Sequence, residues 1–162
     1  MTREISEQLT AFQRLIGLAP WGVKLGHGSF LTLEFGKKIT QEFRGKSHTH
    51  GEWHLWLRSC AWRIQREGRV LIASGDDREV IERAISRLEW GALRKAVVDS
   101  LALDVRLEFA DHLELLAFTN HRYRYEQWEL FKPEGRVLTA NAGGVLAEEA
   151  AGGLERGADA PR

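Results

Sequence analysis

Three histidines and a glutamate alternate along residues 47–54, in the order His48, His50, Glu52 and His54. If this stretch is extended, all four side chains point to the same face, because successive residues of a strand alternate. Imidazole and carboxylate groups are ligands for Zn²⁺ and Fe²⁺, and two histidines one residue apart can bind the same ion. The spacing predicts a metal site formed by His48, His50 and His54. The alternative is that His48 and His50 lie on a solvated loop and His54 begins a strand.

A second group of residues with binding chemistry follows directly. On an extended strand Trp56, Arg58, Cys60 and Trp62 share one face, which places a guanidinium between two indoles. Such an arrangement can bind an anion through charge and cation–π attraction, so we predict an anion pocket formed by Trp56, Arg58 and Trp62. The alternative is a structural ion pair, because a buried arginine needs a partner. The candidate partners on neighbouring strands are Glu108, Glu114 and Glu129.

No catalytic residue is predicted. The glycines of residues 26–29 lack the Lys-Ser/Thr of a phosphate-binding loop and precede a strand, so we interpret them as a turn. Neither Ser74 nor His121 lies in a nucleophile-elbow pattern. Cys60 has no neighbour in the sequence that would lower its pKa, and we expect an inert, buried thiol.

Composition narrows the possible partners. The 162 residues carry 23 basic and 23 acidic side chains, so the formal charge is zero, and the mixing of signs predicts no nucleic-acid partner. No apolar run has the length of a membrane span, and the first residues lack the apolar core of a signal peptide. With a single cysteine no internal disulfide can form. These features predict a cytoplasmic protein without membrane contact.

The elements that position these residues centre on residues 51–75. This stretch predicts a long strand, a tight turn at residues 66–68 and a returning strand over residues 69–73. The polar residues 36–52 before it predict a loop. Apolar spacing predicts helices over residues 3–19 and 77–90, the second with Asp76 as N-cap and Glu79 completing a capping box.

Strict apolar alternation predicts further strands. They cover residues 30–35, 101–109, 113–119, 125–131 and 136–139, with residues 110–112 as a three-residue loop that keeps Leu113 on the buried face. The fold class is therefore α+β: a mostly antiparallel, twisted sheet or partial barrel of about seven strands with two packed helices. One domain is expected over residues 1–146, followed by a flexible Ala/Gly/Glu-rich tail over residues 147–162.

Three segments carry a resemblance to known proteins: residues 25–36 (LGHGSFLTLEFG), residues 51–57 (GEWHLWL) and residues 60–63 (CAWR). Over roughly residues 15–140 the chain resembles a group of small uncharacterised bacterial proteins, a resemblance that implies no catalytic residues. A helix-capped antiparallel sheet with Trp-x-Leu and Pro-x-Gly hairpins is also similar in style to immunity proteins of bacterial toxin systems.

We therefore expect a non-enzymatic bacterial binding protein of immunity or regulatory type, which acts through contact with another protein and needs no cofactor. A homodimer is compatible with this expectation. The alternatives are a small metal protein or enzyme, similar to cupins in its His-x-His pattern and using Zn or Fe, and a protein that binds a small anion at Arg58. The cupin resemblance is incomplete, because His54 stands where cupins have a glutamate.

Overall fold

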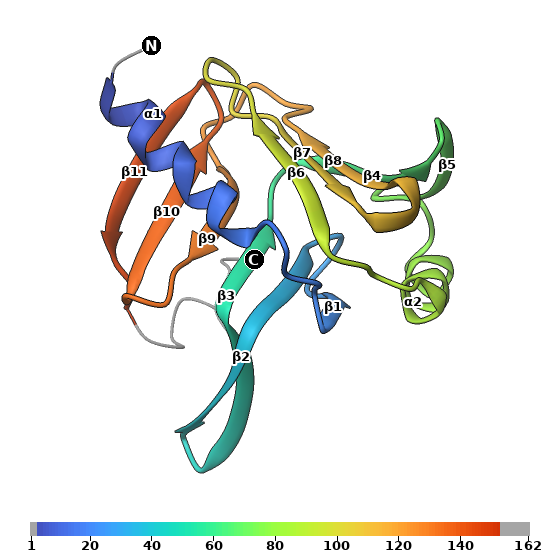
Figure 1. Cartoon of the computed structure of the whole chain (residues 1–162), viewed down its shortest axis with the longest axis horizontal. Coiled ribbons are helices and arrows are strands. Elements are labelled where there is room, and N and C mark those ends of the chain that lie inside the picture. Colours follow the sequence, from blue (N-terminus) through green and yellow to red (C-terminus); the bar gives the residue numbers. More distant parts are fainter. Residues whose placement is uncertain (1–2, 153–162) are drawn as a thin grey trace.

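Eleven strands, each antiparallel to its neighbours, form two sheets in the computed structural model, which describes residues 3–152 (Figure 1). The larger sheet has the order β1-β2-β3-β9-β10-β11 and the smaller one β5-β4-β8-β7-β6. The strands of the larger sheet are β1 (Gly22–Leu25), β2 (Leu31–Phe43), β3 (Lys46–Leu57), β9 (Glu126–Phe131), β10 (Arg136–Asn141) and β11 (Val145–Ala150). Those of the smaller sheet are β4 (Ala61–Arg66), β5 (Arg69–Ala73), β6 (Leu93–Val98), β7 (Val105–Phe109) and β8 (Leu113–Phe118).

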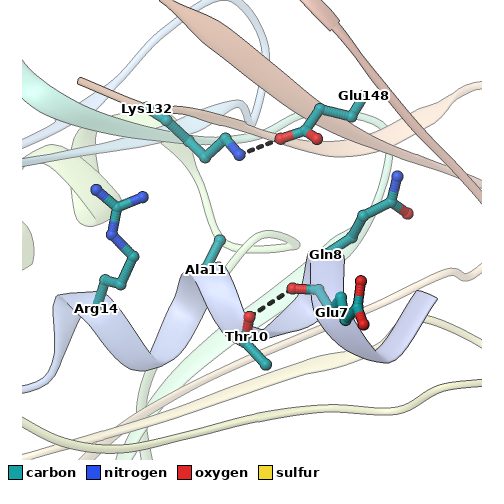
Figure 2. Close-up of a pocket in the computed structure, with 7 residues that line it drawn as sticks. All are labelled: Glu7, Gln8, Thr10, Ala11, Arg14, Lys132 and Glu148. Carbon is teal, nitrogen blue, oxygen red and sulfur yellow. Dashed lines mark hydrogen bonds and ion pairs between the residues drawn. The ribbon is translucent and has the colours of Figure 1, made fainter. Parts of the chain in front are cut away.

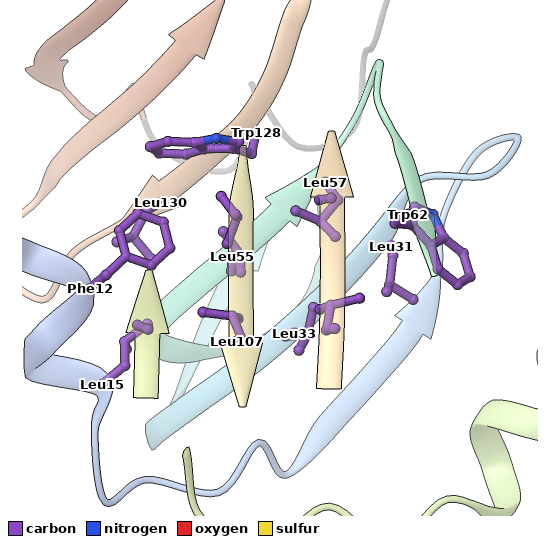
Figure 3. Packing of buried hydrophobic residues seen from close by; sticks show 14 of the residues in the cluster. Phe12, Leu15, Leu31, Leu33, Leu55, Leu57, Trp62, Leu107, Trp128 and Leu130 are labelled. Carbon is purple, nitrogen blue, oxygen red and sulfur yellow. The ribbon is translucent and has the colours of Figure 1, made fainter. Parts of the chain in front are cut away.

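The core lies where the inner faces of the two sheets meet (Figure 3). Leu33 of β2 and Leu55 of β3 are fully buried there with Leu107 of β7, as expected for sheets that bury one face each. The N-terminal segment adds Phe12, whose ring meets the Trp128 ring edge-on at 5.1 Å between centroids. The antiparallel architecture confirms the α+β class, but the described residues contain eleven strands rather than about seven.

The prediction of one long strand over residues 51–65 is wrong, because the chain leaves the larger sheet after Leu57 and joins the smaller sheet at Ala61. At this crossover Arg58 N–H donates to Gln127 O at 2.8 Å and Ser59 N–H donates to Glu126 O at 3.0 Å. The crossover shifts the alternation by one residue. Leu57 and Trp62 consequently face the same core, although an unbroken strand would point them to opposite sides.

Residues 36–52 do not form a loop. They extend β2 and β3 into a two-stranded hairpin that projects beyond both sheets in the lower part of Figure 1. Its turn uses the left-handed conformation at Arg44 (φ 49°) and Gly45 (φ 73°), as the tight hairpin turns require. Both faces of this hairpin are polar, so the sequence carries no apolar alternation that would reveal a strand.

The helices are shorter than predicted. The first comprises α1 (Arg3–Leu9) and the 3₁₀ turn η1 (Thr10–Leu15), and the second, α2, spans Arg78–Arg87. Asp77, not the predicted Asp76, occupies the N-cap position of α2, and its side chain makes no capping hydrogen bond. The Asp76 carboxylate instead accepts a hydrogen bond from Ala73 N–H at 2.8 Å. Within residues 3–152, no helix has the length and apolar character that crossing a membrane requires.

Four further strand predictions need correction, the first being that residues 22–25 form β1, which was not predicted. Residues 93–98 form β6, which was not predicted, and the strand expected over residues 101–109 begins only at Val105 because Leu103 has a positive φ of 62°. Residues 145–150 form β11, although the tail was expected to begin at residue 147; residues 153–162 lie outside the described part. The three-residue loop is confirmed as η2 (Ala110–His112), and Leu113 is buried as that parity requires.

Gly51 provides a test of the β2–β3 pairing. A Cβ at this position would lie 2.5 Å from Phe35 O and 2.6 Å from Trp53 O, so backbone would have to move. We expect Gly51→Ala to lower the free energy of unfolding by about 3 kcal/mol in urea titration. Gly75→Ala is the control, because a Cβ added there would have no atom within 4 Å, and a change within about 0.5 kcal/mol is expected. Equal urea midpoints for the two variants would contradict the pairing.

Candidate functional site

The side chains of Glu34, His54, Trp56, Arg58 and Glu129 form a group that we call the Arg58 face. They alternate along β2, β3 and β9 with the core leucines, so they project from the other side of the larger sheet. Trp56 is only 6% exposed and yet is not part of the core cluster, which agrees with this placement. The Arg58 face therefore contains two of the three residues predicted to bind an anion.

Arg58 lies near two aromatic rings: Trp56, as predicted, and Phe30 in place of the predicted Trp62. Its guanidinium carbon is 5.1 Å from the centre of the Trp56 ring and 5.8 Å from that of Phe30, within the range of cation–π attraction. Arg58 Nη1 also donates to Glu129 Oε2 at 3.1 Å, and the two side chains are 11% and 6% exposed. The predicted ion pair is confirmed, with Glu129 as the partner. The positive charge of Arg58 is thus already matched by a carboxylate.

Trp62, the third predicted ligand residue, lies elsewhere. The crossover at residues 58–60 turns it into the core, where its Nε1–H donates to Ser29 O at 2.7 Å. On the Arg58 face, by contrast, the buried Nε1–H of Trp56 has no acceptor among the described residues. An anion or a carbonyl group bound next to Trp56 could accept a hydrogen bond from this Nε1–H. Trp56 and Arg58 therefore stay predicted ligand residues, whereas Trp62 lies too far into the core to bind the same ligand.

The structure does not bring the three histidines together. His54 Nδ1 hydrogen-bonds the Glu34 carboxylate, and its ring meets Trp56 and Phe131 edge-on. His50 Nδ1 donates to Gly51 O at 2.8 Å. His48 is six residues before His54 on β3, a separation of about 20 Å at the usual rise per residue. Within residues 3–152 no group of three His, Cys, Asp or Glu side chains is placed to hold a metal ion.

Residues 121–125, which we call the aromatic loop, carry a cluster of aromatic side chains that was not predicted from the sequence. The ring centroids of His121, Tyr123 and Tyr125 lie 5.7–6.0 Å apart. Tyr123 and Tyr125 are 59% and 55% exposed, and the Arg122 guanidinium carbon lies 6.0 Å from the centre of the Tyr123 ring. The only two tyrosines of the chain, in alternation with arginines, were the available signal. All of the segment except Tyr125 falls between the strands predicted over residues 113–119 and 125–131, and no binding role was predicted for it.

The aromatic loop is fixed to the crossover between the sheets. His121 Nε2 donates to Ser59 O at 2.7 Å, and Ala142 N–H donates to Tyr125 O at 3.1 Å. Ser59 N–H is in turn bonded to Glu126 O, immediately after the loop. Both ends of the aromatic loop are therefore held by backbone groups, while its two tyrosines face solvent.

A polar hollow of about 360 Å³ lies between the N-terminal helix and the last hairpin (Figure 2). Its cations are paired: Lys132 with Glu148, and Arg14 with Glu134 at 2.8 Å. Arg14 also lies over the Trp53 ring at 4.6 Å from its centre. These contacts fasten the N-terminal segment to the sheet, which is a structural role. The residues that line the hollow are Glu7, Gln8, Thr10, Ala11, Arg14, Lys132 and Glu148.

Comparison of the chain with protein-family models, curated proteins and solved structures finds no match. The resemblance to small bacterial proteins and to toxin-immunity proteins therefore stays a prediction. What the protein does has to be inferred from its own residues.

Breaking the pair on the Arg58 face should be costly, because each partner would be left charged in a buried position. We expect Arg58→Met and Glu129→Gln each to lower the free energy of unfolding by about 3 kcal/mol in urea, and the double variant to lose clearly less than the sum. The exposed Arg14–Glu134 pair is the control, for which each change should cost about 1 kcal/mol or less. Strictly additive losses at Arg58 and Glu129 would show that the pair is not coupled.

Cys60 should be unreactive in the folded protein. Burial raises the pKa of its thiol to about 12; a hydrogen bond with the backbone of Arg58 opposes this rise, and the charge of Asp104 adds to it. A raised pKa means less thiolate at a given pH, so we expect alkylation by iodoacetamide at pH 8 to be at least about a thousandfold slower than in the urea-unfolded chain. Complete alkylation of the folded protein at the unfolded rate would contradict this expectation.

Proposed function

We propose that the protein is a non-enzymatic binding protein that contacts a partner protein through the aromatic loop. The observation that supports this proposal is the exposure of Tyr123 and Tyr125 on a segment whose two ends are held in place. Tyrosine and arginine are the residue types enriched in the energetic centres of protein interfaces. A tyrosine has only two side-chain torsions to immobilise, and an ordered loop lowers the entropy lost on binding.

The surroundings of the aromatic loop suit a partner of moderate acidity. Arg122 and Arg124 are exposed and lie between the aromatic residues. Phe118, at the end of β8 and three residues before His121, is 39% exposed. A partner that covers these residues would bury aromatic surface and gain contacts with two guanidinium groups. An immunity-type or regulatory role in a bacterial cell is consistent with such a contact and needs no catalytic residue.

The test is quantitative capture from a lysate of the protein's own cells with the wild type, Tyr123→Ala/Tyr125→Ala and Val70→Ala/Val80→Ala. Val70 and Val80 are about half exposed and lie on β5 and α2, so their change removes apolar surface elsewhere. We expect a protein that the wild type and the valine variant retain equally and that the tyrosine variant retains at least about tenfold less.

The circular dichroism spectrum and melting temperature of each variant provide the folding control, since surface changes of this kind leave stability nearly unchanged. If all three proteins retain the same set of partners in the same amounts, the aromatic loop is not the contact surface. If none of the three proteins retains more protein than the empty resin does, the proposal that the aromatic loop binds a partner protein is wrong.

A further inference from the structure

The hairpin that projects from the larger sheet has a charge that the neutral composition conceals. We call residues 37–50 of β2 and β3 the arm. It carries four cations, Lys37, Lys38, Arg44 and Lys46, and one carboxylate, Glu42, so its formal charge is +3. Because the whole chain is neutral, the remaining residues sum to −3. The prediction of no nucleic-acid partner rested on the zero net charge and on the mixing of signs along the sequence, whereas the fold gathers these four cations on one projecting hairpin.

The cations of the arm are available to a ligand. All four residues are exposed, and no ion pair within residues 3–152 involves them. Lys38 lies over the Trp21 ring at 4.9 Å from its centre, and Arg44 over the Phe43 ring at 5.1 Å. These ring contacts orient the two charges without neutralising them.

The arm is a two-stranded ribbon, and no further strand of residues 3–152 lies beside it. β1 pairs with β2 only as far as Glu34, and β9 pairs with β3 only from His54 onward. Strand spacing makes such a ribbon about 5 Å wide between backbones, and the major groove of B-DNA, about 12 Å wide, admits a two-stranded ribbon. Lys37 and Lys38 stand at its base and Arg44 and Lys46 at its tip, about 20 Å apart at the usual rise per residue.

We propose that the arm lies in the groove of double-stranded DNA, with its base and tip cations on phosphates. Most side chains between the two cationic pairs can form hydrogen bonds, among them Gln41, Ser47 and Thr49; the apolar exceptions are Ile39 and Phe43. Thr40 Oγ1 lies 3.0 Å from Thr49 Oγ1, and Glu42 is the one negative charge in this part of the arm. Such groups can contact base edges and sugar–phosphate oxygens. This binding goes beyond the proposed protein contact and depends on different residues.

Two other anionic partners fit the arm less well. Protein interfaces are depleted in lysine and serine and enriched in aromatic residues, whereas the arm has three lysines and a single aromatic residue, Phe43. A membrane that the arm approaches end-on would meet only the tip pair and leave Lys37 and Lys38 about 20 Å away. A DNA duplex, with a phosphate charge for about every 1.7 Å of its axis, reaches both pairs.

The experiment is fluorescence anisotropy of a short, labelled, mixed-sequence DNA duplex, titrated with the protein between about 50 and about 200 mM salt. Each phosphate contact contributes about −0.9 to the slope of log K against log salt, so four cations predict a slope of about −3.6. Lys37→Gln/Lys38→Gln and Arg44→Gln/Lys46→Gln should each reduce the slope to about −1.8.

The matched control is Arg83→Gln/Arg87→Gln, which removes two exposed cations from α2 and changes the net charge equally. Its slope should equal that of the wild type. Absence of duplex binding at the lowest salt would overturn the proposal, as would an equal loss of slope in the control. Tighter binding of poly-L-glutamate or of phosphatidylserine vesicles than of the duplex would assign the arm to a protein or a membrane and also overturn it.

Discussion

The structure depends on one change of sheet within four residues. β3 ends at Leu57 and β4 begins at Ala61, so a single stretch of chain supplies a central strand to both sheets. The intervening N–H groups of Arg58 and Ser59 cannot pair within either strand, and they are satisfied by carbonyls at residues 126 and 127. This arrangement lets Leu57 and Trp62 enter the same core. It also fixes the start of β9 and, through the Ser59 carbonyl, the aromatic loop.

Apolar alternation predicted those parts of the fold that bury a single face. Leu31, Leu33 and Phe35 are buried as expected, and the parity of a three-residue loop correctly placed Leu113 and Leu115 inside. Apolar alternation did not predict strands that bury neither face, nor the point at which the buried face of the chain changes. Both faces of the arm are exposed to solvent, so its sequence shows no regular alternation of apolar and polar residues. At residues 58–60 the apolar residues still alternate along the sequence, but the side chains no longer alternate between the same two faces. The backbone N–H groups of Arg58 and Ser59 bond to residues 127 and 126 there, and the chain changes sheet.

The candidate sites differed in how well they could be predicted from the sequence. The Arg58–Glu129 pair was predictable because a buried arginine needs a carboxylate, and few were placed on neighbouring strands. The aromatic loop was not, because exposure of Tyr123 and Tyr125 depends on where β8 and β9 end and on the anchoring of His121. His48, His50 and His54 share β3, although residues 36–52 were predicted to form a loop. Residues on one strand, however, lie in a row, so the side chains of His48 and His54 are too far apart to bind the same metal ion.

The unpaired outer edges of the arm have a consequence for dynamics. Among residues 3–152 its backbone hydrogen bonds connect only β2 and β3, and none of its residues is buried, so the amides of the arm can open to solvent without disturbing the core. Their hydrogen exchange should therefore be far faster than that of β4 or β8, which are paired on both sides. The arm is thus a thermodynamically separate unit. During evolution its length and sequence can change while the two sheets keep their stability.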